Sequence, residues 1–371
     1  MNKVLIVGLS NTHGGVESVI INFFRHFDKK KTQFDFLTIV DNPSYKDEIL
    51  ANGGEIYRIT GRGENAYKFY KECKSFFKNH AHEYSAIWFN TCMLSNLVYL
   101  KYAKRYGIKK RIIHAHVSHN IASFFHFLLH CMNKKIVSRY ATDFWACDES
   151  AAKYTFPRRA INGARSRYRL INNAIDTCRF KYNEESRLKI RSAMGIERNA
   201  IVFGHVGRMD SGKNQEFVIE IFSHILRCKA NSYLLLVGDG PDLEKLKQYS
   251  IDMGIQNNII FLGRRNDVAD ILSAMDVFVF PSKYESFGIS LLEAECSGLM
   301  CYTSDAVPLS ACVCDNVERI SLTESAEFWA NKILNHMLLD QNRLTYSQII
   351  KEKGFDIVHE AHKVQESFIT K

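Results

Sequence analysis

Proline is scarce in this sequence, with five among 371 residues, and no tract is rich in serine and glycine. Neither a disordered linker nor a disordered tail is therefore expected. No internal repeat of solenoid length is found, and no uninterrupted apolar stretch reaches the roughly 20 residues that span a bilayer. The apolar run at residues 4–9 is too short for an export signal and is followed directly by polar residues. It is predicted to form a buried first strand.

No pair of cysteines has the spacing of a zinc knuckle or of a CxxC redox motif. The ten cysteines are scattered, and the closest two are Cys312 and Cys314. Without an export signal, reduced thiols in a cytoplasmic protein are the favoured interpretation. Neither a metal site nor a cofactor is expected from these residues.

The sequence does contain enough apolar material for two cores, together with a surplus of positive charge. Apolar residues make up 46%, charged residues 24%, and the formal net charge is +9. A chain of this length exceeds one typical domain and suits two. Positive charge fits nucleic acid, anionic lipid or phosphorylated ligands, and by itself does not choose among them. No recognised nucleic-acid-binding motif accompanies it, so a nucleic-acid partner is not expected.

Segments of strand and helix length alternate along the chain. Apolar runs of strand length occur at residues 3–8, 34–40, 86–90, 111–114 and 144–147, and again at 200–207, 233–238, 258–263 and 276–281. Segments with helical periodicity, such as residues 15–27 and 64–79, lie between them. This alternation predicts the α/β class with parallel sheets, and two such series predict two doubly wound domains that join near residues 172–180.

Because ligands of open parallel sheets bind beyond the carboxyl ends of the strands, the loops after the strands are the place to look for chemistry. One such loop follows Phe280 and carries Glu285, and a helix is expected to begin near residues 286–288 and to carry Glu293. The start of a helix favours a diphosphate, and a carboxylate can bind two neighbouring hydroxyls of a sugar. The plainer alternative makes Glu285 a helix-dipole acid and Glu293 an exposed helix residue.

A basic loop follows the strand at residues 200–207. Gly207 allows a sharp turn, and Arg208 and Lys213 are expected near the same edge of the sheet. Two cations there could neutralise a departing phosphate, which is electrostatic stabilisation of a leaving group. A solvated basic turn is the alternative. Two further loops follow strands, with Gly238 in a structural turn and Arg264 in a charged turn.

The N-terminal half offers a Gly-Gly pair and two histidines after strands. Gly14 and Gly15 open a helix where the backbone could approach an anion, although the GxGxxG pattern is absent. His114 and His116 alternate along a strand, but no carboxylate or cysteine with ligand spacing accompanies them, so metal binding is not favoured. Residues 121–140 are apolar with a basic end, which suits either an anionic membrane surface or a core helix.

The Glu285-x7-Glu293 spacing, within Tyr-Glu-Ser-Phe-Gly-Ile-Ser-Leu-Leu-Glu-Ala, resembles the motif of retaining GT-B glycosyltransferases of family 4. The run from Gly207 and Arg208 to Lys213 is similar to the phosphate-binding loop of that family, and its bacterial capsular and exopolysaccharide members are the nearest in pattern. Ser286 and Met300 depart from residues common in the family.

The resemblance implies a role for each of these positions. Arg208, Lys213, Glu285 and His116 would be catalytic, with Glu285 on the donor sugar and His116 near the sugars. Substrate would be bound at Gly14, Gly15, Gly207, Gly238, Arg264, Ser286, Phe287, Gly288, Ile289 and Glu293. Glu293 would hold the ribose, and the backbone of Phe287–Ile289 would meet sugar and phosphate.

The same resemblance implies the GT-B fold, with two Rossmann-like domains separated by a cleft. Residues 1–175 would form the acceptor-side domain and residues 176–350 the nucleotide-sugar domain. Residues 351–371 would form a C-terminal helix, for which crossing back to the N-terminal domain is one arrangement.

The expected activity is metal-independent, retaining transfer of a sugar from a nucleoside-diphosphate sugar, with UDP favoured. The acceptor would be a glycan or a polyprenyl-diphosphate-linked saccharide, in the cytoplasm or peripherally on the inner face of the plasma membrane. Two alternatives stay open: a sugar-nucleotide 2-epimerase of the same fold, and a non-catalytic nucleotide-sugar-binding subunit of a glycan assembly complex.

Overall fold

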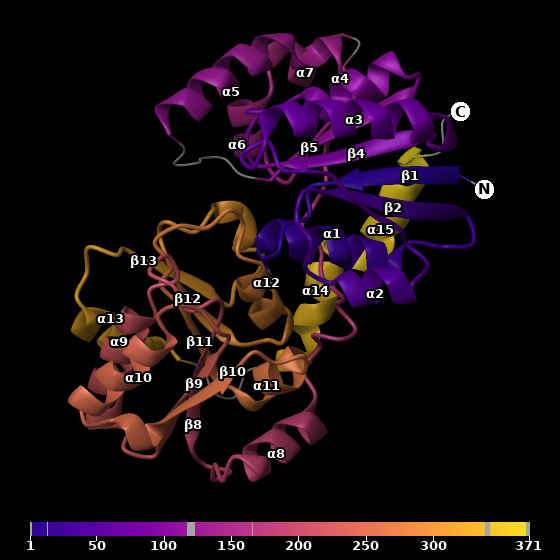
Figure 1. Ribbon diagram of the computed structural model, residues 1–371. Helices are drawn as coiled ribbons and strands as arrows, with labels where there is room; N and C mark the ends of the chain where they lie inside the picture. Colours follow the sequence, from indigo (N-terminus) through magenta and orange to yellow (C-terminus); the bar gives the residue numbers. More distant parts are fainter. Residues whose placement is uncertain (1, 13, 117–122, 165, 338–341, 369–371) are drawn as a thin grey trace. The chain divides into compact units, whose positions relative to one another are not determined.

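The computed structural model describes residues 2–12, 14–116, 123–164, 166–337 and 342–368 (Figure 1). The chain divides into two compact units. The first unit comprises Met1–Ala174 and Ile357–Lys371, and the second comprises Ile175–Asp356. Each unit contains one sheet, and all neighbouring strands in the described part of the chain pair in parallel. The predicted α/β class of two doubly wound domains is confirmed.

The first sheet has seven strands in the order β3-β2-β1-β4-β5-β6-β7. Its strands are β1 (Asn2–Val7), β2 (Thr32–Thr38), β3 (Ile56–Arg58), β4 (Ala86–Thr91), β5 (Lys110–Ala115), β6 (Asp143–Ala146) and β7 (Tyr168–Leu170). The helices of this unit are α1 (Gly15–His26), α2 (Lys46–Ala51), α3 (Ala66–His80), α4 (Val98–Arg105), α5 (Phe124–Ile136), α6 (Glu149–Thr155), α7 (Arg158–Asn162) and α15 (Ile357–Phe368).

Helix α15 completes an aromatic core on one face of the first sheet. It packs against α1, and the ring of Phe368 lies 5.8 Å from those of Phe27 and Trp88 and 5.7 Å from that of Trp145. All four side chains are buried. Since a buried aromatic side chain removes a large apolar area from water, this helix is an integral part of the first unit although it is distant in sequence.

The prediction of one C-terminal helix over residues 351–371 is wrong in its start. Helix α14 (Tyr346–Glu352) ends just inside that range, and α15 begins only at Ile357. The interruption arises at Gly354, which has a φ of +84° and donates its N–H to the carbonyl of Lys351, closing the end of α14. Residues 369–371 lie outside the described part of the chain.

The second sheet has six strands in the order β10-β9-β8-β11-β12-β13. Its strands are β8 (Ile201–Val206), β9 (Ser232–Val237), β10 (Ile259–Gly263), β11 (Val277–Phe280), β12 (Met300–Ser304) and β13 (Val317–Ile320). Its remaining helices are α8 (Glu184–Ala193), α9 (Gln215–Cys228), α10 (Leu243–Asp252), α11 (Val268–Ala274), α12 (Ile289–Cys296) and α13 (Ala326–His336).

Both faces of the second sheet are covered by helices. Because successive strand residues point to opposite faces, Phe278 and Phe280 pack into one core while Val277 and Val279 pack into the other. Helices α8, α11, α12 and α14 contribute to the first of these cores, and α9, α10 and α13 to the second. The near-continuous apolar strands are therefore explained by burial on both sides.

The strand order reverses between β1 and β4 in the first sheet and between β8 and β11 in the second. At such a switch point the following helices diverge to opposite faces, which leaves a crevice at the carboxyl edge. Residues that follow these four strands are therefore the best placed to bind a ligand.

Candidate functional site

The loops after β8 and β11 meet at the switch point of the second sheet through two charged side chains. The ammonium of Lys213 donates a hydrogen bond to Oε1 of Glu285. The side chain of Glu285 is only 8% exposed and that of Lys213 is 24% exposed. The same ammonium lies 5.3 Å from the centre of the Phe280 ring. The structure thus brings two of the predicted catalytic residues into direct contact in a partly desolvated setting.

Backbone and amide contacts hold these two loops together. Asn214 adopts a φ of +61° at the start of α9, and its buried amide donates to the carbonyl of Pro281 at 3.1 Å. The N–H of Lys283 donates to the carbonyl of Gly212 at 2.8 Å. Sequence reasoning did not single out Asn214, although its place next to Lys213 and its tolerance of the left-handed region were signals.

Gly207 and Gly238 lie against each other at the ends of β8 and β9. Gly207 donates its N–H to Val237, and Gly238 donates to the carbonyl of Gly263 at the end of β10. A Cβ atom on Gly238 would lie 2.0 Å from the carbonyl oxygen of Gly207, and its φ is +133°. Only glycine fits there, so three consecutive strand ends form one closely packed backbone surface.

Within the described residues, neither of the two arginines predicted for this site makes a contact like that of Lys213 with Glu285. Arg208 is exposed, and its Nε lies 3.6 Å from the carboxylate of Asp210. Arg264 is exposed directly after Gly263. Both therefore stand on the carboxyl edge of the sheet without a place in the Lys213–Glu285 pair, and both remain accessible to a ligand.

Helix α12 begins at Ile289, slightly later than the sequence predicts. Gly288 precedes it with a φ of +100°, a conformation that few other residues adopt. Phe287 is buried and stacks on Phe355 at 6.0 Å, so its side chain serves the core. Ser286 and Ile289 are partly buried. The first amides of a helix lack partners within it, which leaves N–H donors facing this edge.

Glu293 lies in the second turn of α12 and is partly buried. Removal from water raises the pKa of Glu293 to about 8, and the positive charge of Arg179 opposes this only in part. A carboxyl group in such a setting gains from polar partners such as hydroxyl groups.

His205 is a buried residue of this region that sequence reasoning missed. Its Nδ1 lies 2.9 Å from the carbonyl of Val279, and its Nε2 lies 3.3 Å from Nε2 of Gln215. Gln215 also donates to the carbonyl of Arg208 at 2.8 Å. Burial lowers the pKa of His205 to about 4. The neutral ring therefore stabilises, through Gln215, the loop that carries Arg208 and Lys213. The sequence feature that could have indicated His205 is its place as a polar residue within an apolar strand.

At the switch point of the first sheet, His116 is held by Asn90. His116 Nε2 donates to Oδ1 of Asn90 at 2.8 Å, and both side chains are buried. Burial lowers the pKa of His116 to about 3, so its ring is neutral near pH 7. The ring of His114 lies 4.1 Å away. Asn90 lies near the carboxyl end of β4 and was not among the predicted site residues.

The Gly-Gly turn lies near the same switch point. Gly14 precedes α1 and Gly15 is its first residue, with open space where a side chain of Gly15 would stand. Glu17 in the first turn is buried and accepts a hydrogen bond from Ser10 at 2.6 Å. Gly14, Gly15 and His116 thus belong to the first unit, and the other predicted site residues belong to the second.

Metal ligands are not gathered anywhere in the described ranges. Among those residues, no group of three or more His, Cys, Asp or Glu side chains is placed to hold a metal ion. Likewise, none of the described helices combines the length and the apolar character needed to cross a membrane.

Helix α5 presents apolar side chains to solvent. Phe124 is 83% exposed and Phe125 is 63% exposed, and Phe127, Leu128 and Met132 are also exposed. Lys134 and Lys135 follow in the last turn of the helix. Of the two alternatives for residues 121–140, the core helix is therefore contradicted over α5, while residues 121 and 122 themselves lie outside the described part.

Comparison with known proteins identifies the family of the chain. The family model "Glycosyl transferases group 1" matches residues 186–354. The chain is 30% identical over 339 residues to the putative glycosyltransferase EpsF of Bacillus subtilis, an alignment that covers 89% of this chain and 86% of EpsF.

Two further similarities cover different amounts of the chain. A segment of 115 residues is 38% identical to the Escherichia coli UDP-Gal:alpha-D-GlcNAc-diphosphoundecaprenol alpha-1,3-galactosyltransferase, over 30% of each chain. The fold is similar to that of Anabaena HepE, solved in complex with UDP, with a TM-score of 0.79, 20% identity and 99% of both chains covered. The 30% identity to EpsF over 86% of its length, together with the match to the family model, shows that the chain belongs to the group 1 family of glycosyltransferases.

Proposed function

We propose that this protein is a retaining glycosyltransferase that moves a sugar from a UDP-sugar to a glycan or a polyprenyl-diphosphate-linked saccharide during surface polysaccharide synthesis. The observation that carries the proposal is the pairing of Lys213 with Glu285 at the β8/β11 switch point. Support for a nucleotide sugar comes from HepE, solved with UDP. Support for a lipid-linked acceptor comes from the E. coli galactosyltransferase, whose name specifies a diphosphoundecaprenol saccharide.

In this proposal the second unit binds the donor. Lys213 and Arg208 neutralise the diphosphate as the bond to the sugar breaks, together with the amides at the start of α12. Glu285 accepts hydrogen bonds from the donor sugar, and Glu293 accepts them from the ribose. Arg264 and the backbone at Gly207 and Gly238 border the nucleotide.

The first unit contributes the acceptor side in the same proposal. We expect Gly14 and Gly15 to contact an anionic group of the substrate through their backbone amides, and His116 to act as a neutral hydrogen-bonding group toward a sugar. The acceptor hydroxyl attacks from the face that the diphosphate leaves, so the configuration at the sugar is retained.

The test begins with thermal-shift screening against UDP-, GDP- and dTDP-sugars, which identifies the donor. Arg208→Ala, Lys213→Ala and Glu293→Ala are then assayed separately with that donor and an acceptor, and the anomeric configuration of the product is read by NMR. Wild-type turnover in all three variants, or an inverted product, would overturn the proposal. Incubation with the donor alone identifies an epimerase, since an epimerase changes the sugar without an acceptor.

We further propose that α5 binds the surface of an anionic membrane, as a peripheral contact on the inner face of the plasma membrane. Its exposed Phe124 and Phe125 suit the boundary between headgroups and acyl chains, and the exposed Lys135 suits anionic headgroups. Phe124→Ser/Phe125→Ser should reduce sedimentation with phosphatidylglycerol-containing vesicles. The control is Tyr67→Ser, since Tyr67 is 77% exposed on α3 of the same unit. Equal loss in both proteins would contradict the assignment to α5.

A further inference from the structure

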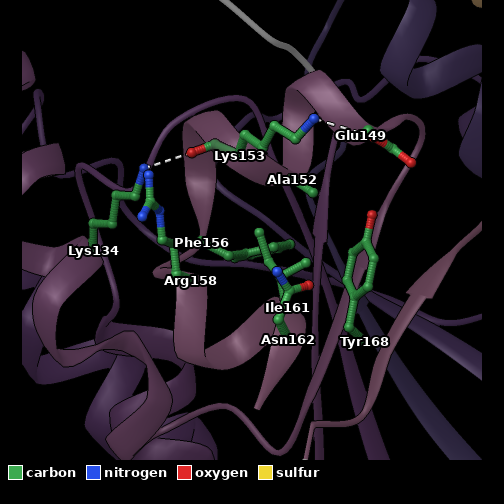
Figure 2. Close-up of a pocket in the computed structure, with 9 residues that line it drawn as sticks. All are labelled: Lys134, Glu149, Ala152, Lys153, Phe156, Arg158, Ile161, Asn162 and Tyr168. Atoms are coloured by element: carbon green, nitrogen blue, oxygen red, sulfur yellow. Dashed lines mark hydrogen bonds and ion pairs between the residues drawn. The ribbon is translucent and has the colours of Figure 1, made fainter.

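The first unit contains a pocket of about 580 Å³ that has no role in the transfer reaction proposed above (Figure 2). It lies among α5, α6, α7 and β7. Its lining residues are Lys134, Glu149, Ala152, Lys153, Phe156, Arg158, Ile161, Asn162 and Tyr168. A volume of this size is in the range of small-molecule sites, which run from about 300 to about 1,000 Å³.

One part of the pocket wall is apolar. Ala152 and Phe156 are buried residues of the core, and Ile161 is partly buried beside them. The hydroxyl oxygen of Tyr168 is shielded from solvent and has no hydrogen-bond partner in the described part of the chain. Because a buried hydroxyl without a partner is costly, this group would gain from a ligand that brings one.

The other part of the wall is cationic, and one of its cations is held in place. Lys134 donates to the carbonyl oxygens of Lys153 at 2.6 Å and of Tyr154 at 2.7 Å. An ammonium carries three N–H groups, so one remains for a ligand. Figure 2 shows Lys134 and Arg158 together on one side of the pocket and Glu149 and Tyr168 on the other.

Arg158 is the cation of the pocket with the most unused hydrogen-bonding capacity. Within the described ranges its guanidinium makes no hydrogen bond or ion pair, whereas Lys153 pairs with Glu149 at 3.1 Å. Three cations against one carboxylate leave the lining with an excess of positive charge. A fixed ammonium beside a free guanidinium matches the oxygens of a phosphate group.

We propose that this pocket binds an amphiphilic phosphate ester. Lys134 and Arg158 hold the phosphate, and the apolar part of the ligand packs on the apolar part of the wall, where Ile161 is partly exposed. The two possible sources share this chemistry: a phospholipid of the bilayer, and a water-soluble phosphate ester with an apolar group. The inference goes beyond the proposed transferase function and does not depend on it, because its test measures ligand binding and not turnover.

Calorimetric titration of the full chain with dihexanoylphosphatidic acid, below its micelle concentration, is the first measurement. Dihexanoylphosphatidylcholine carries the same tails without a net charge and should bind at least about tenfold more weakly. Inorganic phosphate lacks the tails and should also bind more weakly. Equal binding of the choline lipid would overturn the anion site, and equal binding of inorganic phosphate would overturn the role of the apolar wall.

Arg158→Glu should weaken binding of dihexanoylphosphatidic acid at least about fivefold, since one cation near an anionic headgroup contributes a factor of roughly that size. The matched control is Arg169→Glu, which makes the same charge change at an exposed position of β7 outside the pocket lining. Lys153→Gln is a second variant of the lining and should also weaken binding. An equal effect of Arg158→Glu and Arg169→Glu would mean attraction by overall charge and would overturn the pocket.

Vesicles that contain phosphatidic acid distinguish the two sources. If Arg158→Glu also reduces vesicle binding relative to Arg169→Glu, the ligand is a lipid of the bilayer. If only the soluble lipid is affected, the ligand is a free phosphate ester. Either result, after a positive titration, supports the pocket.

Discussion

Lys213 and Glu285 lie 72 residues apart in the sequence and are joined by a charged hydrogen bond between the loops that follow β8 and β11. Each therefore compensates the charge of the other while no ligand is bound. A diphosphate that approaches Lys213 competes with Glu285, and a sugar hydroxyl that approaches Glu285 competes with Lys213. In the proposed function, donor binding exchanges one internal ion pair for contacts to both ends of the substrate.

Loss of this pair should reduce turnover in a coupled way. Lys213→Ala is expected to lower kcat about 100-fold or more, because a preorganised cation at the leaving group is removed. The double variant Lys213→Ala/Glu285→Gln should lose less than the product of the two single effects. Lys245→Ala, which breaks the exposed pair with Glu216, is the control and should keep wild-type kcat. Strictly multiplicative effects in steady-state assays would contradict coupling.

Gly238→Ala should destabilise the second unit. The added methyl group would meet the carbonyl of Gly207, and the φ of +133° disfavours any side chain. We expect a loss of about 2–4 kcal/mol in the free energy of unfolding, measured by urea denaturation. Gly254→Ala is the control, since its φ is +69° but no atom lies within 4 Å of the new Cβ. It should lose only about 1 kcal/mol, and equal losses would show that the contact with Gly207 is unimportant.

Glu295 should make the stability depend on pH. It is buried on α12, and its Oε2 accepts hydrogen bonds from the N–H groups of Val313 and Cys314. Burial raises its pKa from 4.5 to about 8, although these hydrogen bonds oppose the shift. Between these values the folded chain binds more protons than the unfolded chain, so the free energy of unfolding falls as pH rises from about 4.5 to about 8.

Glu295→Gln removes this titration and keeps an acceptor oxygen. Its free energy of unfolding should therefore fall less steeply with pH than that of the wild type, by up to about 1.4 kcal/mol per pH unit. Urea denaturation at about pH 5 and about pH 8 measures the difference between the two proteins. Since Glu293 titrates in both proteins, its contribution cancels, and parallel pH dependences would contradict the prediction.

Chelation of metal ions should leave turnover intact. In the proposed function Arg208, Lys213 and the start of α12 supply the positive charge at the diphosphate. Turnover after dialysis against EDTA should therefore stay within about twofold of its value before dialysis. Loss of a contact that stabilises the transition state would instead lower turnover more than about tenfold. Loss of activity with recovery on addition of Mg²⁺ or Mn²⁺ would contradict this.

Phe368→Ala should destabilise the first unit. The side chain is buried among Phe27, Phe34, Trp88 and Trp145. Truncation of a buried phenylalanine costs about 3–5 kcal/mol, because the cavity is only partly filled by relaxation. Val358→Ala on the same helix is the control, since Val358 is 58% exposed. A similar small effect of both substitutions on thermal unfolding would contradict the role of α15 in this core.

Long apolar strands and the loops after them were predictable from the sequence, because a strand buried on both faces leaves a continuous apolar run. All nine predicted strands lie within about two residues of their predicted positions, namely β1, β2, β4, β5, β6, β8, β9, β10 and β11. Strands β3 and β7 were not predicted, because edge strands of three residues are too short to show the alternation of apolar and polar residues. Strands β12 and β13 were also missed; β12 contains polar Thr303 and Ser304, which are buried through hydrogen bonds.

Site residues that act through a neighbour were the hardest to predict. Lys213 and Glu285 each belong to a recognisable sequence motif, whereas Asn90 and His205 are single polar residues within apolar strands. Their partners, His116 and Val279, are 26 and 74 residues away. Only the strand order brings each pair together, and a sequence read on its own does not give that order.

Because α15 packs on the first sheet, it determines the order in which the two units can complete their folding during translation. All of Ile175–Asp356 is translated before the last helix of the first unit exists. The second unit can therefore complete its core while the aromatic cluster around Trp88 still lacks Phe368. The first unit therefore starts to be translated before the second but completes its core after it. Until Phe368 has been translated, the aromatic cluster stays incomplete and accessible to chaperones.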